Sequence, residues 1–178
     1  MPMEFRAPDV ETYKMVYTDP HREIEPQTAE IEIVDAALRA MVRSGILSGS
    51  DYDQVKFLAF RQAVSERFEI PWTAITPRLQ RVIYAINAIA RPRRMVATGV
   101  FCGNTFICNA GAAVGPGACY DAEDLVGVEI KVEEAERAER NVRLIDPTGK
   151  ARVLAADAVS LVGDYTHPID LLYLDASA

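Results

Sequence analysis

The sequence lacks the features that mark several large classes of protein. It has only three cysteines, Cys102, Cys108 and Cys119, without a CxxC pair, so we expect neither a disulfide framework nor a zinc or redox motif of that spacing. No stretch reaches the roughly 18 apolar residues that a membrane-spanning helix needs. Residues 1–14 lack the apolar segment of a signal peptide. We therefore expect a reduced, cytoplasmic protein with no membrane partner.

Positive charge is also scarce in this chain. Lysine and arginine together number 19 against 26 aspartates and glutamates, for a formal net charge of -7. A protein that binds nucleic acid by neutralising phosphates needs an excess of lysine and arginine, so we expect no nucleic-acid partner. A length of 178 residues with 49% hydrophobic content excludes a disordered chain and suits a domain with a substantial core.

Helical periodicity dominates the first half of the chain. Apolar residues recur every three or four positions from Val34 to Val42, and Gly45 follows as the expected C-cap. Asp51 is the expected N-cap of a second helix, which runs to about Phe68. A third helix is expected from Thr76 as N-cap with proline next to it, since proline suits the first helical position. We interpret residues 1–75 as an N-terminal arm and helical cap.

From residue 94 onward, short apolar runs alternate with helical segments. Four runs have the length of buried parallel strands: Met95–Val100, Leu125–Ile130, Arg152–Ala156 and Ile169–Leu174. Helices are expected between them, at 104–113, 132–145 and 158–162. The alternation predicts an α/β fold over residues 76–178, with a doubly wound, mostly parallel sheet. Ligands of such sheets bind beyond the carboxyl ends of the strands.

A turn rich in small residues follows the first expected strand. The segment ATGVFCGNTF places Gly99 and Gly103 between this strand and a helix start, where the backbone can approach an anionic ligand. A dinucleotide-binding turn uses GxGxxG, but the spacing here is GxxxG and Phe106 occupies the place of the last glycine. The turn therefore disfavours a nicotinamide dinucleotide, which stays the alternative cofactor of an oxidoreductase.

Four motifs in order, TGVFCGNT, LVGVEI, VLAADAV and IDLLYLDA, resemble those of class I S-adenosylmethionine-dependent methyltransferases. The glycine turn and the LLYLD segment resemble most the catechol-type, small-molecule O-methyltransferases. The resemblance covers about residues 76–178 and implies a Rossmann-like methyltransferase fold. It also implies S-adenosylmethionine as cofactor and methyl transfer to an oxygen, or less expectedly a nitrogen, of a small-molecule acceptor.

The resemblance implies a first group of site residues in the glycine turn. Gly99 and Gly103 would let the backbone approach the methionine portion of the cofactor. The hydroxyl of Thr105 would bind the carboxylate of that portion. Phe101 stands where the family often has an aromatic ring over the cofactor.

A second group of site residues follows the next two expected strands. Glu129 would accept hydrogen bonds from both ribose hydroxyls, a task that suits an ionised carboxylate. Ile130 would lie against the adenine ring, Asp157 would accept from its amino group, and Ala158 would supply a backbone amide. The simpler alternative for Asp157 is that it caps the following helix. Residues 131–143 are interpreted as a solvated helix face without chemistry.

The implied catalytic machinery centres on Asp175. The resemblance makes Asp175 a cofactor contact, the catalytic residue and a ligand of a divalent cation such as Mg²⁺. One carboxylate is not a metal site, because magnesium takes several oxygen ligands. The sequence departs from the family at Ala97, where an acidic residue is usual, and at Ala178, where the catechol-type enzymes have a lysine base. These departures support the further alternative of a non-catalytic binding module with this fold.

Two expectations concern what surrounds this domain. Strand 169–174 ends close to the last residue, Ala178, and a raw apolar edge is usually covered. We therefore expect the C-terminal strands of the sheet to be missing here, supplied by a longer natural chain or by another chain. Trp72, Tyr13 and Tyr17 either line an aromatic acceptor pocket or pack in the helical layer or a homodimer contact.

Overall fold

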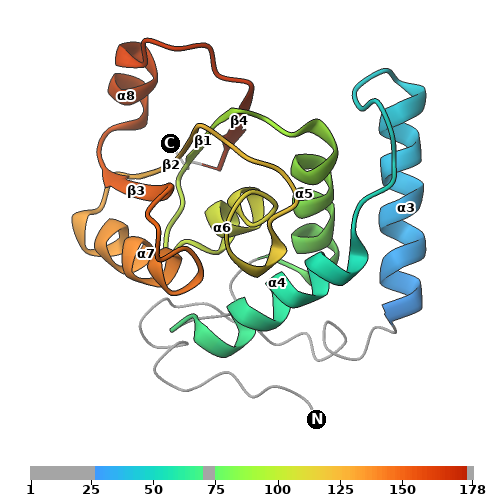
Figure 1. The fold of residues 1–178 in the computed structure, drawn as a ribbon. Coiled ribbons are helices and arrows are strands. Elements are labelled where there is room, and N and C mark those ends of the chain that lie inside the picture. Colours follow the sequence, from blue (N-terminus) through green and yellow to red (C-terminus); the bar gives the residue numbers. More distant parts are fainter. Residues whose placement is uncertain (1–26, 70–74, 176–178) are drawn as a thin grey trace.

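The fold is built on one parallel sheet with helices on both faces. The structure, a computed structural model, describes residues 27–69 and 75–175. The helices are α3 (Gln27–Arg43), α4 (Gln54–Arg67), α5 (Pro77–Ala90), α6 (Asn104–Ala110), α7 (Val132–Ile145) and α8 (Ala158–Asp164), with a 3-10 turn η1 (Gly115–Gly117). The strands are β1 (Arg94–Thr98), β2 (Asp124–Glu129), β3 (Ala151–Ala155) and β4 (Leu171–Leu174). Figure 1 shows α3 beside α5, at the side of the molecule away from α7 and α8.

The described strands pair in the order β3-β2-β1-β4, and every pair is parallel. The predicted doubly wound, mostly parallel α/β sheet is confirmed. The first strand ends two residues earlier than expected, because Gly99 has a φ of 71° and turns the chain out of the sheet. The backbone amides of Gly99 and Val100 both bond to the carbonyl of Val128. From β1 the chain adds β2 and β3 on one side of the sheet and then places β4 on the other side of β1. Ligands of such sheets bind at this switch point.

Helices cover the two faces of the sheet unequally. Met95 and Ala97 of β1 point into the larger core, which α4, α5, α6 and α7 close. Val96, on the other face, packs in a smaller cluster beneath α8. Figure 1 shows α7 and α8 on opposite sides of β3. On β4, Leu172 and Leu174 are 43% and 71% exposed, so the described elements leave part of this strand uncovered.

Side-chain caps set where the N-terminal helices begin. Thr76 accepts from the Leu79 amide at 3.1 Å, which confirms the predicted N-cap of α5. The prediction for α4 was wrong by two residues: Asp53, not Asp51, accepts from the Lys56 amide at 3.0 Å. The reason is reach, because a capping side chain bonds to amides two or three residues ahead.

Three N-terminal helices meet at a buried ion cluster that the sequence did not reveal. Glu30 of α3 accepts from Arg61 of α4 through both carboxylate oxygens, at 2.6 and 3.0 Å. It also accepts from Nε of Arg81 of α5 at 2.5 Å. Both guanidinium carbons lie 4.4 Å from the centre of the Phe57 ring. The cluster therefore ties α3, α4 and α5 together by charge as well as by apolar packing.

Gly127 makes room for an aromatic side chain in the middle of β2. A Cβ at this position would lie 3.0–3.2 Å from ring atoms of Phe106, which is fully buried on α6. We expect Gly127→Ala to lower the free energy of unfolding by about 1–3 kcal/mol, because the ring or the strand must shift. Urea denaturation measures this change. Gly163→Ala in α8 is the control, since its Cβ meets nothing within 4 Å; equal stability of the two variants would contradict the packing described.

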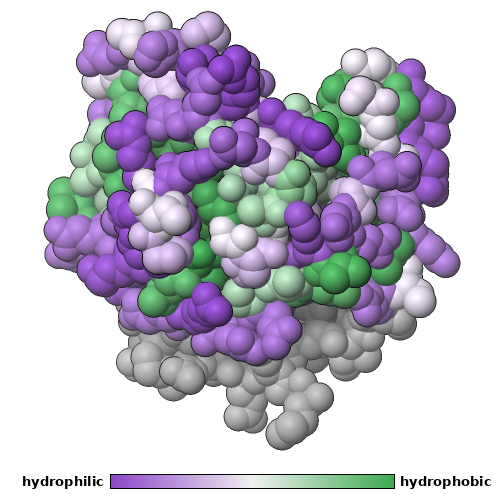
Figure 2. All heavy atoms as spheres, in the orientation of Figure 1, coloured by the Kyte–Doolittle hydropathy of each residue, from purple (hydrophilic) through white to green (hydrophobic). Residues whose placement is uncertain are grey.

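Figure 2 shows hydrophilic side chains over the outer parts of the face in view, with apolar side chains reaching the surface between them. Over residues 27–69 and 75–175, no helix is long and apolar enough to cross a membrane.

Candidate functional site

The turn after β1 is built from left-handed backbone. Gly99, Phe101 and Gly103 have φ values of 71°, 50° and 97°. Glycine adopts this conformation without cost, which explains the two glycines of the predicted turn. A phenylalanine there costs roughly 1–2 kcal/mol and is held only where its surroundings enforce it. The strained residue lies at the carboxyl edge of the sheet, where the sequence predicts the ligand.

Glu129, at the end of β2, enforces this turn. Its Oε2 accepts from the Phe101 amide at 2.9 Å, and its Oε1 accepts from the Lys131 amide at 3.1 Å. The residue is 9% exposed. Each carboxylate oxygen can accept more than one hydrogen bond, so the two amides orient the group and leave acceptor capacity. Phe101 and Glu129 are 28 residues apart in the sequence, and the structure brings them into contact. The sequence predicted both as residues of the same site.

Helix α7 supports the same turn from behind. A Cβ on Gly103 would lie 3.3 Å from the backbone of Ala138. Asn141, one turn further along α7, donates from Nδ2 to the Cys102 carbonyl at 3.0 Å. The sequence did not single out Asn141, and its interpretation of 131–143 as a purely solvated face was wrong on this side of the helix. The available signal was the apolar spacing of Ala135, Ala138 and Val142, which marks the buried face.

Asp157 is committed to a helix cap. Its Oδ2 accepts from the amide and the hydroxyl of Ser160, at 2.8 and 2.9 Å. The hydrogen bond from the Ser160 amide, and then the one from its hydroxyl, lower the pKa of Asp157 below its usual value. The capping alternative is therefore confirmed, while the adenine contacts of Asp157 and of Ala158, the first residue of α8, stay predictions.

Three further predicted residues, Thr105, Ile130 and Asp175, also follow the carboxyl ends of described strands. Thr105 is the second residue of α6 and is partly exposed, and Ile130 is 69% exposed after β2. Asp175 is exposed, and its amide bonds to the Thr98 carbonyl at 3.1 Å, so β4 ends beside β1. Tyr13, Tyr17, Trp72 and Ala178 lie outside the described residues.

The described residues do not make up a magnesium site. In the ranges 27–69 and 75–175 no group of three or more His, Cys, Asp or Glu side chains is placed to hold a metal ion. Asp175 therefore belongs to no such group within these ranges. The metal role of Asp175 stays a prediction.

Two of the three cysteines are core residues rather than nucleophiles. Cys102 and Cys108 are buried, and burial raises the pKa of each thiol to about 12. A thiol with so high a pKa carries almost no thiolate near neutral pH, and the thiolate is the reactive form.

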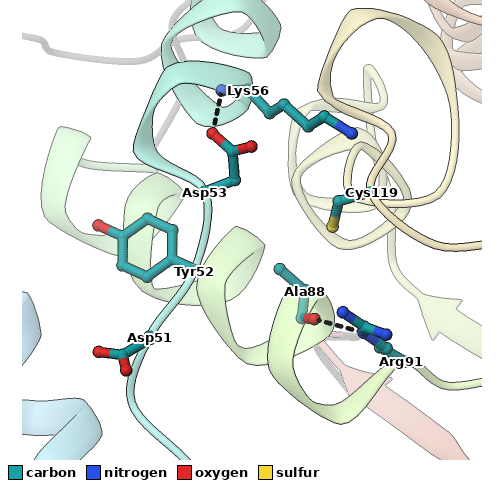
Figure 3. A pocket seen from close by; sticks show the side chains of 7 residues that line it. All are labelled: Asp51, Tyr52, Asp53, Lys56, Ala88, Arg91 and Cys119. Atoms are coloured by element: carbon teal, nitrogen blue, oxygen red, sulfur yellow. Dashed lines mark hydrogen bonds between the residues drawn. The ribbon is translucent and has the colours of Figure 1, made fainter.

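A separate hollow of about 390 Å³ lies at the opposite, amino-end edge of the sheet. Figure 3 shows its walls, which come from the start of α4, the end of α5 and the loop that carries Cys119. Lys56 Nζ donates to the Ala118 carbonyl at 2.7 Å, and Arg91 Nε donates to the Ala88 carbonyl at 3.4 Å. The Lys56 and Arg91 side chains thus donate to the protein's own backbone. This hollow is separate from the predicted cofactor site.

Comparison with known proteins identifies the fold. No protein-family model and no curated protein matches the chain. An O-methyltransferase from Bacillus cereus, solved in complex with SAH, has a TM-score of 0.51 at 17% identity, over 82% of this chain and 63% of that one. TomG from Streptomyces achromogenes, an O-methyltransferase of tomaymycin synthesis solved with SAM, has a TM-score of 0.50 at 20% identity, over 79% and 60%. Cofactor-bound Rv0187 from MTB has a TM-score of 0.51 at 17% identity, over 98% and 62%.

These likenesses show the Rossmann-like methyltransferase fold with N-terminal helices. The resemblance read from the four motifs is confirmed at the level of the fold. The chain spans about three fifths of the length of the solved structures that it matches.

Proposed function

We propose that this protein is an S-adenosylmethionine-dependent methyltransferase that acts on an oxygen of a small-molecule acceptor. The observation that carries the proposal is the contact between Glu129 and the left-handed turn at Phe101. It places a buried carboxylate beside a left-handed backbone turn, at the carboxyl edge of a methyltransferase fold. The structural neighbours solved with SAM or SAH support the same cofactor.

The proposal assigns described residues to the two ends of this cofactor. Gly99 lacks a side chain in the turn that the methionine portion would approach, and Thr105 follows Gly103 by two residues, in the first turn of α6. Gly103 lets the turn pack against the backbone of Ala138 on α7. Glu129 keeps acceptor capacity for the ribose hydroxyls after bonding two amides. A dinucleotide-binding turn would have its third glycine at the position of Phe106. The Phe106 ring instead packs against Gly127, so this turn disfavours a dinucleotide.

The chain's part in the reaction is mainly positioning. Bound S-adenosylmethionine supplies an electrophilic methyl group on its sulfonium. The protein must hold the acceptor oxygen in line with that group and receive its proton. Asp175, at the end of β4 beside β1, is the proposed catalytic residue. No step is assigned to a metal ion, since the described residues do not form its site.

Calorimetric titration with S-adenosylhomocysteine and, separately, with NAD tests the proposal. We expect saturable binding of S-adenosylhomocysteine and no binding of NAD. Binding of NAD alone would overturn the proposal in favour of an oxidoreductase. Binding of neither would overturn it in favour of a non-catalytic module.

A further inference from the structure

Asn141 is a buried polar residue with both ends of its amide in use. It is 2% exposed on α7. Its Nδ2 donates to the Cys102 carbonyl at 3.0 Å, and its Oδ1 accepts from the Glu69 amide at 3.1 Å. One side chain therefore joins the turn after β1 to the backbone that follows α4. Leaving either buried partner unsatisfied costs the free energy of removing that group from water.

The Cys102 carbonyl lies at a sensitive point of the turn. The peptide unit between Cys102 and Gly103 follows Phe101, with φ 50°, and precedes the φ of 97° at Gly103. On its other side this peptide unit donates its amide to the Val100 carbonyl at 2.8 Å. A peptide unit is planar, so fixing its carbonyl also fixes the direction of its amide. Asn141 thus sets the orientation of the backbone between the two left-handed residues.

Glu129 and Asn141 hold the turn from opposite ends. Glu129 takes the Phe101 amide, whereas Asn141 takes the Cys102 carbonyl. Ala138, one helical turn before Asn141, contacts the position of the Gly103 Cβ at 3.3 Å. The turn is therefore fixed between β2 and α7 and does not depend on its own sequence alone.

We infer that Asn141 is a positioning residue, which keeps the glycine turn in the conformation that receives the methionine end of the cofactor. The inference rests on the proposed function. Asn141 is buried behind the turn and acts through the Cys102–Gly103 peptide. Its link to Glu69 makes the turn and the end of α4 parts of one hydrogen-bonded unit.

Asn141→Asp separates the two bonds of this side chain. The variant keeps an acceptor for the Glu69 amide but loses the donor to the Cys102 carbonyl. We expect the dissociation constant of S-adenosylhomocysteine to rise by roughly 10- to 100-fold, as a loss of 1.4 kcal/mol is tenfold in affinity. Titration calorimetry gives the affinity and thermal unfolding gives the stability.

Asn87→Asp is the matched control. Asn87 is 1% exposed on α5 and donates to the Ile83 carbonyl and to Asn109 Oδ1, without contact to the turn. It is expected to lose stability but to keep the wild-type affinity. Wild-type affinity in folded Asn141→Asp would overturn the inference, whereas no binding by the wild-type protein would overturn the proposed function instead.

A second variant of Asn141 tests the inference if the aspartate variant does not fold. If Asn141→Asp does not fold, Asn141→Ser is expected to fold and to show the same loss of affinity. If both Asn141 variants unfold while Asn87→Asp folds, the positioning role is overturned in favour of a general structural one.

Discussion

Replacing Glu30 by alanine is expected to lower the free energy of unfolding by about 3–5 kcal/mol, because it leaves buried charge without its partner. Glu30 is 4% exposed and Arg81 is 0% exposed. Without the carboxylate, Arg61 and Arg81 keep two like charges near the same Phe57 ring. The attraction of each cation to the ring is present with or without Glu30, so it does not replace the lost ion pairs.

Glu32→Ala provides the comparison for this loss. Glu32 belongs to the same helix, but it is exposed and has none of these buried contacts. Its replacement is expected to change stability by less than about 0.5 kcal/mol. Urea denaturation of both variants against the wild type measures the difference. A Glu30→Ala protein as stable as Glu32→Ala would show that α3 does not depend on the ion cluster.

The free energy of unfolding at low pH also depends on the Glu30 carboxylate. Burial acts to raise the pKa of Glu30, but the hydrogen bonds and charges of Arg61 and Arg81 outweigh it, so the pKa is lowered from 4.5. A group with a lowered folded pKa stabilises above its unfolded pKa and loses that contribution as pH falls through the folded value. Glu30→Gln is therefore expected to show a weaker decline of stability below about pH 4.5 than the wild type.

The sequence predicted the parts of this fold that depend on neighbours in the chain. The period of apolar residues predicted α3 and α5, and the pairing of Thr76 with Pro77 placed the start of α5. The short apolar runs gave four parallel strands within one or two residues. These features follow from local geometry, so a single sequence carries them. The error at Asp51 arose because Asp53 offers the same cap two residues later.

Contacts between distant segments escaped prediction. Glu30 pairs with Arg61 and Arg81, which are 31 and 51 residues away, and nothing in the sequence distinguishes these arginines from solvated ones. Asn141 lies among charged residues of α7, and only the packed fold reveals its bond to Cys102. The turn at Gly99 was predictable because left-handed backbone demands glycine, but the left-handed Phe101 depends on Glu129 in the next strand.

Glu129→Ala is expected to weaken the binding of S-adenosylhomocysteine by at least about 100-fold. A charge-assisted hydrogen bond contributes about 1.5–3 kcal/mol, and two to the ribose would be lost together. The variant also removes the acceptor that holds the Phe101 amide, so the strained turn loses one of its two supports. The loss therefore affects both ends of the cofactor, and titration calorimetry measures it directly.

Glu133→Ala separates this effect from a general change in charge. Glu133 is exposed in the first turn of α7, only four positions from Glu129, and none of the bonds that hold the turn involves it. It is expected to bind S-adenosylhomocysteine as the wild type does. If folded Glu129→Ala also binds like the wild type, the ribose assignment is wrong and Glu129 serves only to shape the turn. If Glu129→Ala loses binding while its thermal unfolding stays close to that of Glu133→Ala, the carboxylate acts on the ligand itself, because a purely structural role would reduce both.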